Sequence, residues 1–242
     1  MSESHQPSTK THQPKLKVCG LTQLDQLREL VALKTDFLGF IFYEKSPRSV
    51  LNHLSLEQIS EIQHDGKVGV FVNETVEKIV EVSEKADLNF IQLHGDENEN
   101  YILRLRQRLR KQIEIIKVIR IGNQSSNELQ KSINQNLSTI NYFLFDTDSK
   151  AFGGTGKTFD WNILNDLEIS IPYFLSGGIS LENMKELKNF DKVNMHEKAL
   201  TKLNPPFALD INSKFEIEAG IKDVGKIKEL ISKFKSPNGT IF

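Results

Sequence analysis

The chain has 242 residues, of which 38% are hydrophobic and 26% are charged, as in a globular protein long enough to bury a substantial core. Its 31 Lys and Arg residues nearly balance its 32 Asp and Glu residues, so no excess charge favours a nucleic acid or a membrane surface as a partner. The single cysteine, Cys19, excludes an internal disulfide, and no apolar run approaches the roughly 20 residues that span a bilayer.

The two ends of the chain are polar and predict tails. Residues 1–14 are rich in Ser, Thr, Gln, His and Pro and lack the apolar stretch of a signal peptide, which predicts a disordered segment and a cytoplasmic location. Residues 236–242 predict a short frayed end. We therefore expect residues 15–235 to form the folded domain.

Short apolar runs alternate with segments of helical periodicity along this domain. The predicted strands are residues 16–19, 37–42, 67–72, 89–94, 113–119, 142–146, 172–176 and 207–210. The predicted helices follow at about residues 23–33, 55–63, 75–85, 96–110, 126–134, 160–166, 180–188 and 222–235. Four polar residues near helix starts are available as N-caps: Thr22, Ser55, Asn73 and Ser180.

A strand followed by a helix, eight times in succession, predicts a parallel sheet, because neighbouring parallel strands need crossover connections. Eight such units in about 220 residues predict an α/β fold, a closed (β/α)8 TIM barrel in a single domain, with a doubly wound open sheet as the alternative. In such a barrel the loops after the strands carry the chemistry. Six of the eight predicted strand ends carry a reactive, charged or glycine-rich group: Cys19-Gly20, Ser46-Pro47-Arg48, His94-Gly95, Asp146-Thr147, Ser176-Gly177-Gly178 and Asp210.

The segment AFGGTGKTF, residues 151–159, is similar to a phosphate-binding P-loop. Its Gly-Lys-Thr end fits the pattern, but Ala151 occupies the position of the first glycine. A P-loop lysine also opens a long helix directly, whereas Phe-Asp-Trp at residues 159–161 intervenes here. A nucleotide-binding protein is therefore an alternative that a rise in melting temperature with ATP would favour.

Eight motifs in order resemble one known family. They are KVCGLT (17–22), DFLGFIFYEKSPRSV (36–50), VGVFVN (68–73), FIQLHGDE (90–97), FDT (145–147), GGTGKTFDW (153–161), LSGGIS (175–180) and GIKD near residue 220. Together they resemble the phosphoribosylanthranilate isomerase family of tryptophan biosynthesis, from about residue 16 to 230. In that family GGTG-x-x-FDW is the loop after the sixth strand, beside the active site. The resemblance therefore gives residues 151–159 a purpose other than nucleotide binding.

The resemblance implies an Amadori rearrangement of N-(5-phosphoribosyl)anthranilate to a 1-amino-1-deoxyketose. An acid protonates the furanose ring oxygen and a base removes the C2 proton, so neither a redox cofactor nor a metal is implied. Cys19 matches the family's general base and Asp146 its general acid.

Lys17 lies two residues before Cys19 on the same strand face, so we expect it to lower the thiol pKa. We expect burial or a nearby anion to raise the pKa of Asp146. The alternatives are a small buried Cys19 without function and an Asp146 that caps a turn.

Substrate-binding roles follow from the same resemblance. Arg48 matches the residue that grips the anthranilate carboxylate, because a guanidinium can pair with both oxygens. Without this context a solvated loop arginine is the alternative. His94 and Asp210 match positions that line the pocket, where each could instead be a packed barrel residue. Backbone N–H groups at four positions are expected to bind the phosphate: Gly177, Gly178, Asn212 and Ser213. A simple tight turn is the alternative for the two glycines.

Two features depart from the family pattern. Lys214 stands where the family usually has glycine, which matters if the backbone there needs a positive φ, although its charge could instead assist phosphate binding. The connection at residues 189–206 is longer than usual, and we expect it to alter packing or association rather than chemistry. The expected partner is the small-molecule substrate, with the chain a monomer or a weak homodimer.

Two further functions are weighed against this one. The related Amadori isomerase of histidine biosynthesis usually pairs two aspartates in an internally repeated barrel, whereas Cys19 and Asp146 stand here without an evident half-barrel repeat. A binding module that has lost turnover would keep the pocket, but both proton-transfer residues are present.

Overall fold

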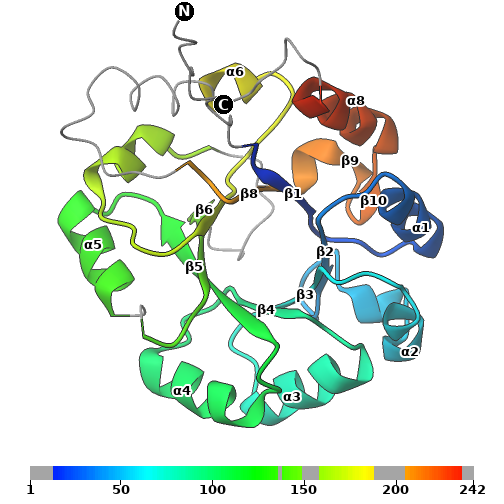
Figure 1. Cartoon of the computed structure of the whole chain (residues 1–242), viewed down its shortest axis with the longest axis horizontal. Coiled ribbons are helices and arrows are strands. Elements are labelled where there is room, and N and C mark those ends of the chain that lie inside the picture. The colour runs from blue at the N-terminus through cyan, green and yellow to red at the C-terminus, as the bar shows by residue number, and fades with distance from the viewer. Residues whose placement is uncertain (1–12, 136–137, 149–157, 188–204, 236–242) are drawn as a thin grey trace, which may run out of the picture.

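Eight parallel strands close into a barrel in the computed structural model, which describes residues 13–135, 138–148, 158–187 and 205–235 (Figure 1). The strands are β1 Lys15–Val18, β2 Phe37–Ile41, β3 Lys67–Phe71, β4 Phe90–Leu93, β5 Glu114–Ile121, β6 Tyr142–Thr147, β7 Tyr173–Leu175 and β8 Ala208–Ile211. Each pairs with the next, and β8 returns to β1 with Asp210 opposite Lys17. The predicted TIM barrel is confirmed, and the open-sheet alternative is wrong.

The helices surround the barrel on its outside (Figure 1). They are α1 Leu24–Ala32, α2 Leu56–Ser60, α3 Val76–Lys85, α4 Glu99–Arg108, α5 Ser126–Asn134, α6 Met184–Leu187 and α8 Val224–Lys235. Three short 3-10 helices are η1 Val50–Asn52, η2 Trp161–Asp166 and η3 Ser213–Phe215. The helix predicted at residues 160–166 is thus a 3-10 helix, because Asn and Asp residues give this segment a low α-helix propensity. None of the helices in the described ranges is long and apolar enough to cross a membrane.

One of the four predicted N-caps is confirmed. Ser55 forms a capping box with Gln58 at the start of α2. Thr22 instead donates its hydroxyl to the carbonyl of Gly220 at 2.6 Å, and α1 begins after Gln23 without a side-chain cap. Thr75, not Asn73, caps α3, and the Asn73 side chain accepts from the N–H of Asp96 at 2.7 Å. α6 begins only at residue 184, so Ser180 does not adjoin it. The predictions at Thr22 and Asn73 are wrong because contacts between loops use their side chains.

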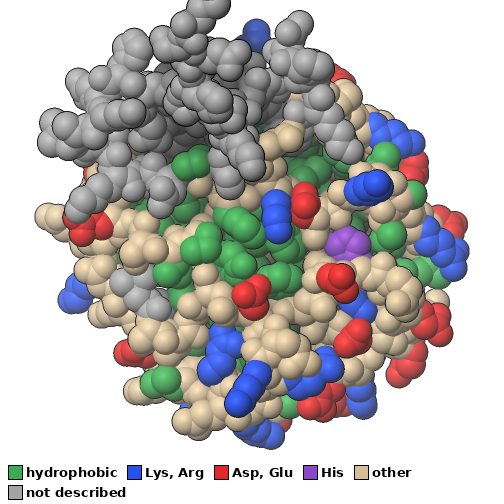
Figure 2. All heavy atoms as spheres, viewed as in Figure 1, with side chains coloured by type: hydrophobic (Ala, Val, Ile, Leu, Met, Phe, Trp, Pro, Cys, Tyr) green, Lys and Arg blue, Asp and Glu red, His purple; other side chains and the backbone are tan. Residues whose placement is uncertain are grey.

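Two apolar clusters fill the molecule. The larger lies between the barrel and the helices and includes Leu27, Leu30, Ile79 and Val82. The smaller lies inside the barrel and consists of Phe37, Val68, Ile116, Val118, Leu144, Phe174 and Ala208, with Phe90, Tyr142 and Phe207 packed against it. Figure 2 shows hydrophobic side chains gathered in the middle of the ring on the face that it presents.

Aromatic rings close the amino end of the barrel. The ring centroid of Phe174 lies 5.2 Å from that of Phe37 and 5.5 Å from that of Tyr142, and Tyr142 lies 5.1 Å from Phe207. Successive side chains along a strand alternate between its two faces, so residues two or four positions further along share the inner face. Four positions after Phe90 and Tyr142 lie His94, directly after β4, and Asp146, on β6. The barrel interior therefore changes from apolar to titratable toward the carboxyl ends of the strands.

Several predicted segments lie largely outside the described residues. They are the tails at residues 1–14 and 236–242 and the long connection at residues 189–206.

Candidate active site

The carboxyl ends of four strands bring most of the predicted site residues together. Cys19 follows β1, His94 follows β4, Asp146 lies near the end of β6, and Asp210 lies on β8. The Lys17 ammonium connects two of them, because its Nζ donates to Oδ1 of Asp210 at 2.9 Å and also hydrogen-bonds Cys19. Nε2 of His94 lies 3.5 Å from Oδ2 of Asp146. These side chains form one buried cluster, which we call the titratable cluster.

A glycine on the neighbouring strand makes room for Cys19. A Cβ atom added to Gly39 would lie 2.9 Å from both the Sγ and the Cα of Cys19. A real Cβ essentially never approaches another heavy atom so closely, so any side chain at residue 39 must displace the thiol. The position of Sγ therefore depends on Gly39 as well as on β1.

Burial and charge shift the pKa of Asp146 upward. Removal from solvent and the negative charge of Asp210 raise it to about 6, against the opposing hydrogen bonds from Thr147 and Ser176. The expected upward shift of Asp146 is present. A carboxyl group with this pKa keeps its proton in an appreciable fraction of molecules near neutral pH.

The pKa of Cys19 is raised, so the expected net lowering is wrong for this structure. Burial is the largest cause, and it outweighs the positive charges of Lys17 and Lys222, while the negative charge of Asp210 adds to the increase. Burial also lowers the pKa of His94 to about 3, with help from Lys17. The imidazole is therefore neutral, and its Nδ1 lies 3.2 Å from Nε2 of Gln92.

Arg48 is held at the rim of the titratable cluster rather than solvated. Its Nε lies 2.9 and 3.0 Å from the two carboxylate oxygens of Glu216, and its Nη2 lies 2.7 Å from Oε2. Lys222 donates to Glu216 at 2.7 Å and to Oδ1 of Asn212 at 2.8 Å. Sequence reasoning assigned no role to Glu216 or Lys222. The sequence signals that could have identified them are the position of Glu216 in the segment after β8 and that of Lys222 in the GIKD motif.

Two loops lie side by side at the ends of β7 and β8. Gly177 and Gly178 both have a positive φ, of 87° and 73°, and a Cβ on Gly177 would lie 2.7 Å from Oγ1 of Thr147. Asn212 and Ser213 begin the neighbouring loop. Glu182, which follows the glycine turn, has a lowered pKa chiefly because of hydrogen bonds with Ser180 and its own backbone, and the charges of Lys226 and exposed Lys214 contribute. Lys214 is absent from the positive-φ residues of the described ranges, so lysine in place of glycine causes no left-handed strain there.

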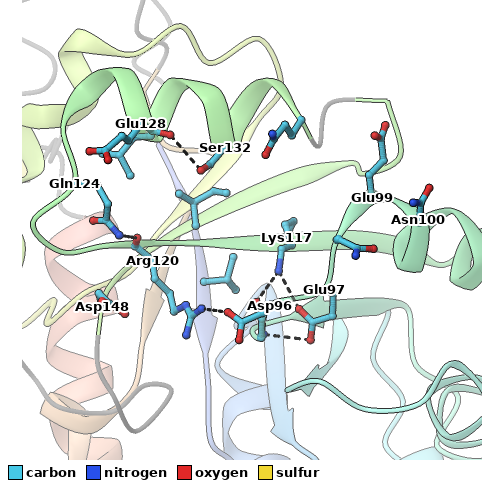
Figure 3. Close-up of a pocket in the computed structure, with 16 residues that line it drawn as sticks. Asp96, Glu97, Glu99, Asn100, Lys117, Arg120, Gln124, Glu128, Ser132 and Asp148 are labelled. Atoms are coloured by element: carbon cyan, nitrogen blue, oxygen red, sulfur yellow. Dashed lines mark hydrogen bonds and ion pairs between the residues drawn. The ribbon is translucent and has the colours of Figure 1, made fainter.

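A separate cavity of about 650 Å³ lies between α4, β5 and α5 (Figure 3). Its principal charged groups pair with one another: Lys117 donates to Oε2 of Glu97 at 2.9 Å, and Arg120 pairs with Asp96. The two basic residues of its lining therefore already have acidic partners. Across the described ranges, no group of three or more His, Cys, Asp or Glu residues is placed to hold a metal ion.

Comparisons with known proteins identify one family. The model of the family "N-(5'phosphoribosyl)anthranilate (PRA) isomerase" matches residues 16–233. The N-(5'-phosphoribosyl)anthranilate isomerase of Parabacteroides distasonis is 36% identical over 225 residues, which cover 92% of this chain and 94% of that protein.

Two solved structures share the fold over most of both chains. Monomers generated from the dimeric phosphoribosylanthranilate isomerase of Thermotoga maritima match with a TM-score of 0.67 and 29% identity, covering 90% of this chain and 97% of that one. A phosphoribosylanthranilate isomerase in complex with reduced 1-(o-carboxyphenylamino)-1-deoxyribulose 5-phosphate matches with a TM-score of 0.66 and 28% identity, with the same coverage.

Proposed function

Since this chain belongs to the N-(5'-phosphoribosyl)anthranilate isomerase family, and is therefore an isomerase of tryptophan biosynthesis, we propose that Asp146 is its general acid and Cys19 its general base. The observation that carries the proposal is the titratable cluster, where a carboxyl with a pKa of about 6 and a thiol share one buried site. Family membership over residues 16–233 argues against the three alternatives, which are a nucleotide-binding protein, an isomerase of histidine biosynthesis and a non-catalytic binding module. Most of the P-loop-like segment, residues 151–157, lies outside the described residues.

The first half of the reaction needs a proton donor. Protonated Asp146 gives its proton to the furanose ring oxygen, the bond from that oxygen to C1 breaks, and the nitrogen lone pair forms the iminium. The raised pKa of Asp146 supports this role, because an ordinary aspartate would hold almost no proton at neutral pH.

The second half needs a base. The Cys19 thiolate removes the proton from C2, and the electrons of that C–H bond neutralise the iminium to give an enolamine, which tautomerises to the ketose. Lys17 stabilises the thiolate through its positive charge, and Asp210 holds Lys17 at 2.9 Å. His94 and Asp210 line the same site and are proposed to contact the sugar. No redox cofactor or metal enters this scheme.

Binding of the two anionic ends of the substrate is proposed at two neighbouring parts of the rim, after β2 and after β7 and β8. Nη1 of Arg48 makes no hydrogen bond to another described residue, so that edge of the guanidinium suits the anthranilate carboxylate. The neighbouring loops after β7 and β8 suit the phosphate, with backbone N–H groups at Gly177, Gly178, Asn212 and Ser213 and the charge of Lys214 nearby. A weak homodimer also stays a proposal, supported by the dimeric relative.

Turnover of freshly generated phosphoribosylanthranilate, followed by the loss of its fluorescence, tests the proposed function. We expect an enzyme-dependent decay that yields a product of unchanged mass. An inert wild-type protein that still binds the reduced product analogue would overturn the assignment of Cys19 and Asp146 as acid and base.

Arg48→Lys is expected to raise KM about tenfold or more with a smaller effect on kcat, because an ammonium cannot present two parallel donors to a carboxylate. The matched control is Arg28→Lys, since Arg28 is exposed on α1 and pairs only locally with Asp25. Steady-state kinetics of both variants decide the point. Equal KM values for Arg48→Lys and Arg28→Lys would show that Arg48 does not recognise the carboxylate.

Gly39→Ala is expected to lower kcat/KM by up to about a hundredfold, because displacing a reacting group by about 1 Å has effects of this size. The added methyl would otherwise lie 2.9 Å from Sγ of Cys19. Gly225→Ala on α8 is the control, because its Cβ would meet only a side-chain oxygen of Asp223 at 3.2 Å. Full activity in Gly39→Ala would show that the position of the thiol is unimportant.

A further inference from the structure

A short hairpin after β8 carries the residues that hold Arg48. Its strands are β9 Glu216–Glu218 and β10 Ile221–Lys222. Glu216 accepts from Arg48 through both carboxylate oxygens, and its Oε1 also accepts from Lys222 at 2.7 Å and from the N–H of Gly220 at 3.1 Å. The exposed fractions of the Arg48, Glu216 and Lys222 side chains are 12%, 4% and 0%. We call these three side chains the carboxylate clamp.

The hairpin is itself fixed to the start of the barrel. The Gln26 side chain exchanges two hydrogen bonds with the backbone of Lys222, at 2.8 and 2.9 Å. The hydroxyl of Thr22 donates to the carbonyl of Gly220 at 2.6 Å. Glu216 is therefore supported from two sides, and it does not depend on Arg48 for its position.

The charges of the clamp leave it suited to an anion. Arg48 and Glu216 alone would form a neutral pair with little attraction for a carboxylate. Burial lowers the pKa of Lys222, against the opposing charge and hydrogen bond of Glu216. With two acceptors within 2.8 Å, the Lys222 ammonium restores one net positive charge. Although burial opposes its ionisation, Glu216 has a lowered pKa because of hydrogen bonds and charge from Arg48 and Lys222, so it stays a carboxylate.

The clamp also fixes where Arg48 lies relative to the thiol. A Cβ on Gly20, the residue after Cys19, would lie 2.9 Å from Cδ of Arg48 and 2.8 Å from Oδ1 of Asn212. The arginine stem therefore passes directly over the backbone next to the general base. A carboxylate bound to its outer edge would bring the amine nitrogen, which is ortho to the carboxylate on the anthranilate ring, and with it C1 and C2 of the sugar, toward Cys19.

We propose that Glu216, held by Lys222, is a positioning residue that orients Arg48 for the carboxylate of the substrate. Glu216 occupies the Nε and Nη2 edge of the guanidinium and leaves the Nη1 edge facing the ligand. This inference rests on the proposed role of Arg48, and it adds a residue that touches no substrate atom.

The test compares two ligands on wild type and Glu216→Gln. One is reduced 1-(o-carboxyphenylamino)-1-deoxyribulose 5-phosphate, and the other is the same molecule without the carboxylate. We expect Glu216→Gln to weaken binding of the first by about tenfold or more and of the second by less than about twofold, since a neutral amide holds the guanidinium poorly. Loss of folding alone would weaken both ligands equally. If Glu216 only dampens the charge of Arg48, its removal would tighten the first ligand, and tighter or unchanged binding overturns the proposal.

Three further variants separate the possible failures. Glu218→Gln, an exposed position two residues along the same hairpin, is expected to bind both ligands as wild type does. Glu216→Asp keeps the charge but is one methylene shorter, so it should fold and still lose part of the carboxylate preference; an unchanged preference there also overturns the proposal. If Arg48→Lys keeps the full preference for the carboxylate, the role of Arg48 itself fails. If Arg48→Lys loses the preference and neither Glu216 variant does, only the present inference fails.

Discussion

Cys19→Ala is expected to lower kcat for the isomerisation of phosphoribosylanthranilate by about a hundredfold or more, the usual contribution of a positioned general base. Lys17 contacts the thiol as well as Asp210, and the missing side chain at Gly39 leaves room for Cys19. Because the carboxylate clamp and the phosphate loops are untouched, binding of the reduced product analogue should stay within about threefold of wild type. Single-turnover kinetics and analogue titration measure the two quantities.

Cys19→Ser separates the chemistry from the packing. A hydroxyl fills nearly the same space as a thiol but ionises far less readily, so we expect the serine variant to be about as inactive as the alanine variant. A serine variant within about tenfold of wild type would mean that another group removes the C2 proton.

Asp146→Asn is expected to cause a loss of similar size, about a hundredfold or more in kcat/KM, because an amide of the same shape cannot donate the proton. We also expect the dependence of kcat/KM on pH to differ between this variant and wild type. In wild type the working form needs Asp146 protonated and Cys19 ionised. As the pH rises from about 6, the acid loses its proton as fast as the base gains its charge.

The product of those two fractions is flat between the pKa of Asp146 and the higher pKa of Cys19, so wild-type kcat/KM should form a plateau over that range and fall on either side. Without the acid, the residual activity of Asp146→Asn depends on the thiolate alone and should rise about tenfold per pH unit across the same range. A flat profile for the variant would show that Asp146 is not the acid that limits the wild-type plateau.

The fold was predictable because its signals are local. Each barrel strand is short and apolar, each is followed by a turn, and parallel strands then bring their carboxyl ends to one face. Cys19, His94, Asp146 and Asp210 could be placed there from sequence because each ends or follows a predicted strand. The motifs that resemble the family then supplied roles that spacing alone does not give.

The parts that could not be predicted depend on distant contacts. The pKa of Cys19 rises because the folded barrel removes it from water, which Lys17 two residues away does not reveal. The β9–β10 hairpin has too few residues for an alternating pattern, and Ile217 within it is 75% exposed. Glu216 is 168 residues away from Arg48 in the sequence, so the ion pair between them has no local signal.

The aromatic rings that close the amino end of the barrel lie away from the site, so stability and catalysis depend on different ends of the barrel. Rings such as those of Phe37, Tyr142 and Phe174 pack at the amino end of the barrel, while Cys19 and Asp146, the proposed proton-transfer groups, lie at the carboxyl ends of β1 and β6. Substitutions of one large apolar residue for another at the amino end can therefore change the thermal stability of the enzyme while leaving its activity unchanged. Adaptation to a new temperature and adaptation to a new substrate can proceed at opposite ends of one barrel.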